Sequence, residues 1–569
     1  MKKTRLLFIT LGVILIASIA LTACQPAATE APAEEAAPAE EAAPAEEAAP
    51  AEEAAPMDEG PAVGGNFVFA NTQEPDTLDI YKSSFAISSL VTSNIGGSLV
   101  AKNADGQMVP YLAKSWDISD DGLVYTFHLR DDVKFHNGDP FTANDYKWTW
   151  DRCRTEGFVC PVSASMLAPI VSIEATDDYT LVLTLAEPNY YILSSLGAYD
   201  YLQPLDQAVV EADGDNYGLS GYSAVGVGPY MLKEWVQDEK IVLERNPDFV
   251  WGPELFEGGN TGPYYLETLE FRVVPDEATV LAAVEAGELG YATVEAKDLE
   301  TVKALGNYTI NDIMPTGISY LQFNLQNPMF TDLKVRQALN LAVDKEAILQ
   351  VSLQGQGVVI DGPLSPAMIG YDESAMKGTG YGYDLEAAKA LMEEAGYTYD
   401  ADGMLLNPDG EPFAFTLLST ADESTTKNVT MVVDMYKQLG VAVEIQQMEW
   451  GTMAPLVFGG EYEMCAMGVG WPDADVLYMM YHSANIGGIN FAYYSNPDLD
   501  DLLVQARTLV DPVEHQQAVN RAYSLIVDEA LLVPLFTPTS FIAIHNDFQG
   551  AVISPFIGVI SSDIHYVGE

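Results

Sequence analysis

Short stretches of alternating apolar and polar residues occur in the N-terminal half of the chain. In residues 124–130, polar side chains separate Tyr125, Phe127 and Leu129. Successive side chains of a strand point to opposite faces, so this pattern predicts a half-buried β-strand. Similar patterns predict strands over residues 66–71, 178–186 and 240–244.

Apolar residues at helical spacing predict helices in the C-terminal half. One helix is predicted over residues 333–350, where the apolar face comprises Val335, Ala338, Leu339, Ala342 and Val343. Another helix follows Asp384, whose side chain can cap the first turn, and ends at Gly396. A third is predicted over residues 499–510.

Strands and helices alternate around residues 413–448. Predicted strands over residues 413–419 and 441–448 flank a helix around residues 428–439. This order is typical of an α/β layer structure. Because both element types occur throughout the chain, we expect a mixed fold rather than a purely helical or purely β one.

The N-terminal residues predict export and a lipid anchor. A basic start, Met-Lys-Lys-Thr-Arg, precedes an apolar run over residues 6–20, which is shorter than the about 20 residues of a membrane span. This combination is typical of a signal peptide. Residues 21–24 (Leu-Thr-Ala-Cys) resemble the bacterial lipobox, which implies removal of residues 1–23 and lipidation of Cys24. An ordinary signal peptide with an unmodified cysteine is the alternative.

Residues 24–63 have the composition of a spacer. The motif Pro-Ala-Glu-Glu-Ala-Ala occurs four times, beginning at Pro32, Pro38, Pro44 and Pro50. These regularly spaced prolines interrupt any helix, and the glutamates repel one another. We therefore expect an acidic, disordered tether that gives the folded part reach from the membrane surface.

The chain is strongly acidic. It holds 83 acidic and 26 basic residues, a formal net charge of −57. Most of the acidic residues lie beyond residue 60, so the tether does not explain the excess. Nucleic acid is excluded as a partner because a surface of this sign repels phosphates. Two interpretations remain, a solvated surface that aids solubility and an attraction for cationic ligands.

Two of the remaining cysteines are predicted to pair. Cys153 and Cys160 lie in one polar, loop-like stretch, and an exported protein can keep disulfides. We expect a local disulfide between them, with two free thiols as the alternative. Cys465 lies in an apolar run and is expected to be a small buried residue.

Motifs of common enzyme classes are absent from the sequence. There is no Gly-x-x-x-x-Gly-Lys-Ser/Thr phosphate loop, no His-Glu-x-x-His zinc motif and no Gly-x-Ser-x-Gly nucleophile elbow. His128 and His136 are not expected to form a metal site by themselves. We therefore expect a protein that is not an enzyme and that carries no metal or other cofactor.

Several segments in a fixed order resemble the family 5 extracellular solute-binding proteins, the group that contains dipeptide-, oligopeptide- and nickel-binding proteins of ABC importers. The longest match, residues 110–145, begins Pro-Tyr-Leu-Ala-Lys-Ser-Trp and ends Val-Lys-Phe-His-Asn-Gly-Asp-Pro-Phe-Thr-Ala-Asn-Asp. Shorter matches occur at residues 227–230, 243–247, 283–289, 323–325, 335–340 and 494–498. The resemblance extends over essentially all of residues 64–569.

The resemblance implies an α/β fold of two lobes, like a type II periplasmic-binding-protein clam, with an extra inserted α+β domain. The expected parts are lobe I (residues 64–95, 225–318 and 530–569), the inserted domain (96–224) and lobe III (319–529). The chain is expected to cross between lobes near residues 320–326 and 533–539. These extended segments would act as hinges for closure around a ligand.

The resemblance places ligand contacts in two segments of lobe III. Residues 449–451 (Glu-Trp-Gly) and 470–475 (Gly-Trp-Pro-Asp-Ala-Asp) match segments that line the cleft in the family. Trp450 and Trp471 are the leading candidates, because aromatic walls suit a cleft that must desolvate its ligand. A place in the hydrophobic core is the alternative for each tryptophan.

A departure from the peptide-binding pattern lies just after Trp471. Peptide-binding members carry an aspartate ahead of an Asp-Pro-Asp turn, where it pairs with the amino terminus of the peptide, and this chain is slightly shorter there. Asp473 and Asp475 are the acidic candidates, and either could instead cap a helix over residues 476–480. An oligosaccharide is therefore the alternative to a peptide ligand, because it would fit aromatic walls without a charged anchor.

In lobe I, Glu74 and Asp76 follow the first predicted strand, in a segment that borders the cleft in the family. They could hold a cationic or hydroxyl group of a ligand, with a role in a turn as the alternative. Arg336, in a helix typical of the family, is expected to be structural.

These features predict a substrate-binding lipoprotein of an ABC importer, which faces the periplasm or cell exterior and captures a peptide or other small solute. Its partners would be the cargo, the membrane permease subunits and, through Cys24, the cell membrane; a monomer is expected. An oligosaccharide-binding member is the alternative within the family, and a metal complex such as nickel ranks last. An exported hydrolase of peptides or glycans and an adhesive surface protein are the alternatives of other classes.

Overall fold

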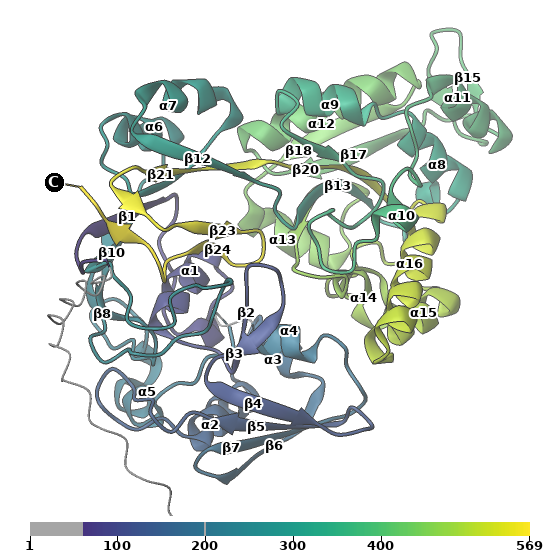
Figure 1. Ribbon diagram of the computed structural model, residues 1–569. Coiled ribbons are helices and arrows are strands. Elements are labelled where there is room, and N and C mark those ends of the chain that lie inside the picture. Colours follow the sequence, from purple (N-terminus) through teal and green to yellow (C-terminus); the bar gives the residue numbers. More distant parts are fainter. Residues whose placement is uncertain (1–60, 198–200, 569) are drawn as a thin grey trace, which may run out of the picture. The chain divides into compact units, whose positions relative to one another are not determined.

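The computed structural model describes residues 61–197 and 201–568. The expected signal peptide (residues 1–23), Cys24 and nearly all of the expected tether (residues 24–63) lie outside the described residues. The described chain is a mixed α/β structure whose three main sheets belong to lobe I, the inserted domain and lobe III (Figure 1). Every helix in this part of the chain is too short or too polar to cross a membrane.

Lobe I is built on a seven-stranded sheet. Its elements are β1 (Asn66–Asn71), α1 (Ala86–Ile95), β8 (Tyr230–Val236), β9 (Lys240–Arg245), β10 (Thr268–Val273), α6 (Glu277–Glu285), β11 (Tyr291–Val294), α7 (Leu299–Leu305), β12 (Tyr308–Ile313), β21 (Ser540–His545), β22 (Phe548–Gln549), β23 (Val552–Ser554), β24 (Gly558–Ile560) and β25 (His565–Tyr566). The sheet has the order β12-β21-β11-β1-β10-β9-β8, and β1 runs parallel to both of its neighbours.

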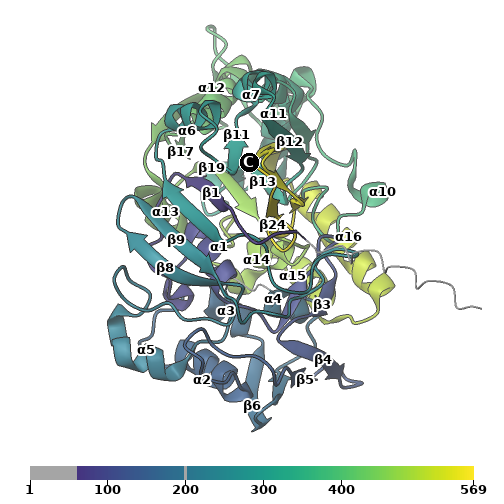
Figure 2. The same cartoon turned by 60° about the vertical axis from the view of Figure 1, so that its left-hand side comes forward.

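The inserted domain contains a four-stranded antiparallel sheet, seen at the bottom of Figure 2. Its elements are β2 (Val100–Lys102), β3 (Met108–Pro110), β4 (Ala113–Ile118), β5 (Val124–Leu129), α2 (Ala143–Cys153), α3 (Ser163–Leu167), β6 (Ile170–Asp177), β7 (Thr180–Leu185), α4 (Ile192–Leu196) and α5 (Gln207–Asp213). Helix α2 begins at a capping box formed by Thr142 and Asp145. Cys153, at the end of this helix, forms a disulfide with Cys160.

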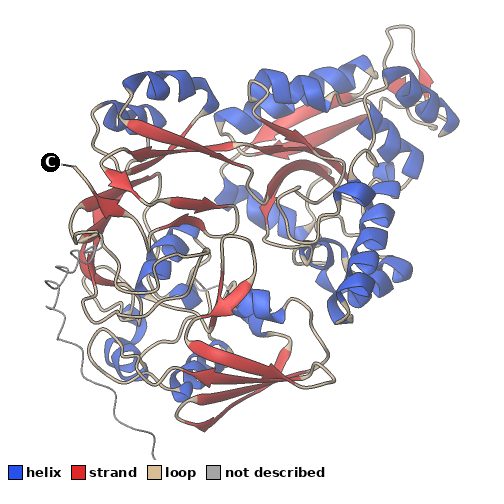
Figure 3. Ribbon diagram, viewed as in Figure 1, coloured by secondary structure: helices blue, strands red, loops and turns tan. Residues whose placement is uncertain are grey.

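Lobe III is built on a six-stranded sheet with helices around it (Figure 3). Its elements are β13 (Gly317–Phe323), α8 (Leu333–Leu341), α9 (Lys345–Ser352), β14 (Gly357–Val359), α10 (Glu373–Met376), α11 (Leu385–Glu394), β15 (Thr398–Tyr399), β16 (Leu405–Leu406), β17 (Ala414–Ser419), α12 (Glu423–Gln438), β18 (Ala442–Gln447), α13 (Trp450–Gly459), β19 (Met464–Gly470), α14 (Val476–Tyr481), α15 (Pro497–Thr508), α16 (Pro512–Asp528) and β20 (Leu532–Pro538). The sheet order is β14-β20-β13-β19-β17-β18.

Helices cover both faces of the lobe III sheet. Tyr320 of β13 packs in a core with side chains of α14, α15 and α16, whereas its neighbour Leu321 packs with those of α8, α9 and α12. Adjacent residues of a strand point to opposite faces, so each face has its own layer of helices. This is the α/β arrangement that the alternation of strands and helices predicts.

Most predicted elements are confirmed to within a few residues. Strands β1, β5, β7 and β9 correspond to the four strands predicted in the N-terminal half, and β17 and β18 flank α12. Helix α11 begins after Asp384, whose carboxylate accepts a hydrogen bond from the Ala387 amide. The single helix predicted over residues 333–350 is wrong. It is broken between α8 and α9, because Asp344 caps a new helix by accepting from the Ala347 amide at 2.9 Å.

The chain crosses between lobe I and lobe III at two short segments. Residues 314–316 connect β12 to β13, and Thr539 connects β20 to β21. The expected crossing at 320–326 therefore falls too late, since most of it lies inside β13. Strand β20 pairs with β13 and β14, so residues 532–538 belong to the lobe III sheet. The expected boundary at residue 530 assigns them to lobe I and therefore lies too early. The sequence of a buried strand predicts extended backbone, but it does not show which sheet the strand joins.

One hydrophobic core extends through lobe I and the inserted domain. It contains Phe67 and Phe271 of the lobe I sheet together with Phe127 and Trp150 of the inserted domain. The buried apolar residues of lobe III form separate cores, and within residues 61–197 and 201–568 none of these cores includes a residue from the other two parts. The inserted domain is therefore fused to lobe I through its interior, whereas lobe III has an interior of its own.

Candidate functional site

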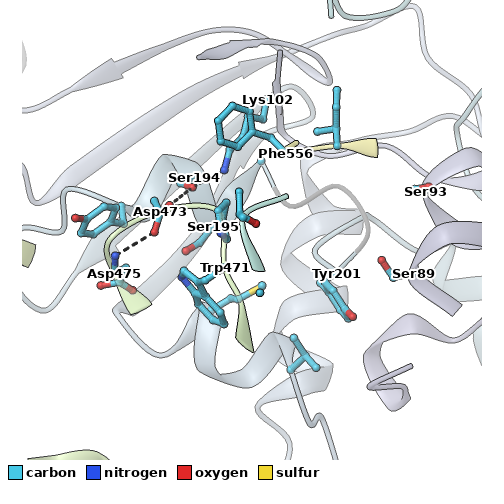
Figure 4. Close-up of a pocket in the computed structure, with 18 of the residues that line it drawn as sticks. Ser89, Ser93, Lys102, Ser194, Ser195, Tyr201, Trp471, Asp473, Asp475 and Phe556 are labelled. Carbon is cyan, nitrogen blue, oxygen red and sulfur yellow. Dashed lines mark hydrogen bonds between the residues drawn. The ribbon is translucent and has the colours of Figure 1, made fainter. Parts of the chain in front are cut away.

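A cavity of about 540 Å³ is lined by all three parts of the folded chain (Figure 4). Lobe I contributes residues of α1, and the inserted domain contributes Lys102 and residues of α3 and α4. Lobe III contributes the loop after β19, and the crossing segment contributes Thr316. Because the wall is shared between lobes I and III next to a crossing segment, relative movement of the lobes would change the size of the cavity.

The loop after β19 places Trp471 and Asp473 in the cavity wall. Ile369 holds this loop by two backbone hydrogen bonds. The Ala474 amide donates to the Ile369 carbonyl at 2.8 Å, and the Ile369 amide donates to the Pro472 carbonyl at 3.0 Å. Trp471 is half-buried and packs against the core formed by α14, α15 and α16, so its ring is supported from behind and lines the cavity.

Asp473 is almost fully buried, with 3% of its surface exposed, and it contacts the inserted domain. The hydroxyl of Ser194 donates to its carboxylate at 2.6 Å, and the Lys102 ammonium donates to the Ser194 oxygen at 2.9 Å. Burial raises the pKa of Asp473 to about 6; the neighbouring charge of Lys102 opposes this rise, and the charge of Asp475 adds to it. The polar chain from Lys102 through Ser194 to Asp473 therefore joins the inserted domain to lobe III at the cavity wall.

Asp475 is held by an arginine of its own lobe. The guanidinium of Arg507 donates two hydrogen bonds to the Asp475 carboxylate, at 2.6 and 2.7 Å, and it lies 3.6 Å from the centre of the Tyr478 ring. This bidentate pair occupies both carboxylate oxygens. Asp475 occupies the N-cap position of α14, as the alternative role expects, but neither Asp473 nor Asp475 accepts a side-chain hydrogen bond from the first amides of this helix.

The other three candidate contacts lie elsewhere. Trp450 is the first residue of α13, is 47% exposed and does not line the cavity. Glu74 accepts hydrogen bonds from the Trp235 indole at 2.5 Å and from the Asp238 amide at 3.2 Å. Asp76 accepts from the hydroxyls of Ser83, at 2.5 Å, and Ser88, at 2.8 Å.

The structure thus brings Trp471, Asp473 and Asp475 together at the cavity, whereas Glu74 is bonded to β8 and the turn after it, and Asp76 to two serines. Several cavity residues were not candidates from the sequence: Lys102, Tyr191, Ser194, Tyr201 and Phe556. They come from distant segments without a shared motif, so no local signal could have identified them.

The described residues contain no preformed metal-binding site. Within residues 61–197 and 201–568, no cluster of three or more His, Cys, Asp or Glu side chains is arranged to hold an ion. His128 bonds to Asp117 at 2.9 Å, whereas the partly buried His136 lies beside the Gly228 carbonyl at 3.0 Å. The two histidines therefore have separate partners.

Arg336 has a structural role, as expected. Its guanidinium donates hydrogen bonds to the carbonyls of Phe330 and Glu529.

The sequence is similar to known solute-binding proteins over most of its length. The family model for bacterial extracellular solute-binding proteins, family 5 Middle, matches residues 107–489. The oligopeptide-binding protein AppA of Bacillus subtilis is 27% identical over 508 residues, which cover 87% of this chain and 90% of AppA. The heme-binding protein A of Haemophilus influenzae is 28% identical over 481 residues, which cover 80% of this chain and 83% of that protein.

Solved structures of such proteins share the fold. AppA in complex with a nonapeptide matches with a TM-score of 0.76 at 25% identity, over 89% of this chain and 99% of AppA. The ABC transporter-associated periplasmic binding protein DppA of Helicobacter pylori, in complex with the peptide STSA, matches with a TM-score of 0.76 at 28% identity, over the same shares of the two chains. The expected α/β fold of two lobes is confirmed. On both the family match and these likenesses, the chain belongs to the bacterial extracellular solute-binding proteins of family 5.

Proposed function

We propose that this protein is the lipid-anchored substrate-binding component of an ABC importer, and that it captures a short peptide or similar small solute. The observation that carries the proposal is the cavity whose wall is shared by lobe I, the inserted domain and lobe III. A ligand that touches both lobes favours the closed state, because its binding free energy is larger there. The crossings at residues 314–316 and 539 are short enough to act as hinges.

Peptide is the first candidate cargo. The relatives AppA and DppA were solved with a nonapeptide and a tetrapeptide sequence, STSA. The volume of the cavity lies within the range of about 300–1,000 Å³ that is usual for sites of small organic ligands. The ATP-using step and the passage through the membrane would belong to other subunits of the importer, and the protein itself would perform no covalent chemistry.

An oligosaccharide is the second candidate cargo. Asp473 and Asp475 are both engaged by protein groups, so they are not poised to receive the ammonium group of a peptide amino terminus. Trp471 and Tyr201 place aromatic side chains at the cavity, and Ser93 and Ser195 add hydroxyl groups. Aromatic faces and neutral hydrogen-bonding groups suit an uncharged ligand rich in hydroxyls.

The proposal includes a lipid anchor that holds the protein at the cell surface. Lipidation at Cys24 and the acidic tether over residues 24–63 would hold the folded part near the permease while allowing it to turn. Metabolic labelling with a palmitate analogue tests this: wild-type protein should incorporate label in the membrane fraction, and Cys24→Ser should not.

A thermal-shift screen of the mature protein tests the receptor function. The panel comprises short peptides, neutral oligosaccharides and nickel chelates. A ligand at about 100 times its dissociation constant adds roughly 2.7 kcal/mol to the free energy of unfolding. Stabilisation by peptides supports the first cargo, and stabilisation by oligosaccharides alone supports the second. The receptor proposal is wrong if no member of a broad panel stabilises the protein, whether the protein hydrolyses the panel members or leaves them unchanged.

A further inference from the structure

Lobe III contacts the inserted domain directly beside the cavity. We propose that the inserted domain is the surface onto which lobe III closes, and that Tyr190, Tyr191 and Ser194 are positioning residues that hold the closed state. This inference rests on the proposed function, because closure is the step by which a solute receptor retains its cargo. It assigns the inserted domain a mechanical role in addition to those of the two lobes and their hinges.

The first contact is an aromatic cluster around His515 of α16. The ring of Tyr190 stacks on the His515 imidazole, with centroids 3.7 Å apart and planes 9° apart. Tyr191 meets the same imidazole edge-on, and its hydroxyl oxygen lies 3.2 Å from His515 Nε2. Tyr191 and His515 are both almost fully buried, so the cluster excludes water between the inserted domain and lobe III. Such ring pairs contribute orientation-dependent attraction in addition to burial.

Two polar contacts accompany this cluster. The Tyr190 amide donates to the Arg507 carbonyl at 2.7 Å, and the Arg507 side chain holds Asp475 at the cavity wall. The Ser194 hydroxyl donates to Asp473 at 2.6 Å (Figure 4). Tyr191, Ser194 and Asp473 also line the cavity. Cargo that orders these side chains therefore favours the same arrangement of the inserted domain and lobe III.

A further contact lies at the turn between β2 and β3. Gly106 in this turn has φ 81°, and a Cβ atom added to it would lie 2.8 Å from Cδ1 of Ile369 in lobe III. The turn thus lies against the Ile369 side chain, whose end would have to shift to admit a Cβ atom at residue 106. Ile369 is hydrogen-bonded through its backbone to the loop that carries Trp471 and Asp473, so this contact is connected to the cavity wall.

The inserted domain is firmly attached to lobe I. Arg152 of α2 donates hydrogen bonds at 3.1 and 2.6 Å to Asp79 of lobe I, whose side chain is fully buried. The hydroxyl of Tyr81 donates to the Gln203 carbonyl at 2.8 Å and accepts from the Trp150 indole at 3.1 Å. Together with the shared core, these bonds make the inserted domain move with lobe I. Lobe III then moves relative to both.

Cross-linking tests the docking contact without any ligand. Ser194→Cys and Asp473→Cys are combined in the full mature chain, which is then treated with a mild oxidant. Of the native cysteines in the described chain, Cys153 and Cys160 are already paired and Cys465 is buried. We expect a disulfide between residues 194 and 473, identified by mass spectrometry of the linked peptides.

The control pair replaces Ser194→Cys by Ser172→Cys. Ser172 lies on β6 of the same domain and bonds to Glu174 within its own strand, so no cross-link to residue 473 is expected. If the 194–473 pair cross-links no faster than the control pair, lobe III does not close onto α4 and the proposal is overturned.

Variants of Tyr190 test its positioning role in the cross-linking background. Tyr190→Ala removes the stack on His515 and should lower the cross-linking rate about three- to tenfold, whereas Tyr190→Phe keeps the ring and should restore the rate. Tyr222→Ala is the matched control, because Tyr222 is an exposed tyrosine of the same domain, 47% accessible to solvent. An unchanged rate in Tyr190→Ala would show that the aromatic cluster does not position lobe III.

The experiments distinguish failure of the receptor function from failure of the docking contact. If no solute in the panel binds while the 194–473 cross-link forms, the receptor proposal fails and the docking contact stands. If a panel peptide or oligosaccharide binds, Tyr190→Ala should raise its dissociation constant by about the factor by which the cross-linking rate falls. Equal affinities for wild type and Tyr190→Ala would overturn the coupling between closure and binding.

Discussion

At the scale of single residues, similar side chains have different roles in this protein. Asp473 and Asp475 are two positions apart, yet the first meets Ser194 of the inserted domain and the second is held by Arg507 of its own lobe. Trp450 and Trp471 also differ, since only the latter lines the cavity. Residue type therefore identifies candidates, and the packing around each one decides whether it can meet a ligand.

The two tryptophans provide a direct test of the cavity. Trp471→Ala should weaken binding of the cargo about ten- to hundredfold, because a large aromatic side chain buried against a ligand contributes roughly 1.5–3 kcal/mol. Trp450→Ala should leave the dissociation constant unchanged, since Trp450 is exposed on α13. Isothermal titration calorimetry measures both. A larger loss in Trp450→Ala than in Trp471→Ala would place the cargo outside this cavity.

Closure should couple the protonation of Asp473 to binding. Burial raises the pKa of Asp473 to about 6, whereas a solvated aspartate titrates near 3.9, so the closed state takes up a proton more readily. Lowering the pH from about 7 to about 5 should therefore strengthen binding roughly tenfold through this group. His515 and the cargo titrate as well, so the contribution of Asp473 is the difference between wild type and Asp473→Asn. No difference between their pH profiles would mean that closure does not bury Asp473.

At the scale of elements, side-chain caps determine where several helices of lobe III begin. Asx caps begin α9, α11, α15 and α16, so these helices start at defined residues. Helix α14 lacks such a cap, and the Asp475–Arg507 pair joins its first turn to the end of α15 instead. This pair therefore supports the loop that carries Trp471.

Breaking the Asp475–Arg507 pair should destabilise lobe III. Asp475→Ala or Arg507→Ala should each lower the free energy of unfolding by about 3 kcal/mol, because one charge is left without its partner in a mostly buried place. The double variant should lose less than the sum, measured by urea denaturation. Lys377→Ala removes an exposed pair with Glu373 and should have no measurable effect. Strictly additive losses would contradict a direct pairing.

At the scale of the whole molecule, the distribution of cores separates what is fixed from what can move. Lobe I and the inserted domain share one core, whereas lobe III is connected to them by two short crossings and by contacts beside the cavity. Interfaces without a shared core are easier to open than interiors. Movement is therefore expected between lobe III and the other two parts together.

Cargo should make the protein more compact. Small-angle X-ray scattering of the mature protein is expected to show a smaller radius of gyration with saturating cargo than without it, because the ligand stabilises the closed state. The same cargo should produce a smaller decrease in Tyr190→Ala, which lacks the stack on His515. Saturated protein with an unchanged scattering curve would contradict a closing mechanism.

The sequence by itself determined the features that depend on neighbouring residues. Alternation placed β5, β7 and β9, and the cap at Asp384 placed the start of α11, because strand faces and helix ends are local properties. Motifs in a fixed order indicated the family and its two lobes. The export signal, Cys24 and the tether also rest on local patterns and stay predictions.

Only the tertiary structure decided the rest. The sheet that β20 joins, the engagement of Asp473 by a serine 279 positions away and the stacking of Tyr190 on His515 are contacts between distant segments. The same is true of the place of Trp471 at the cavity and of Trp450 outside it. Local patterns cannot predict these features, because each depends on how separately formed elements pack against one another.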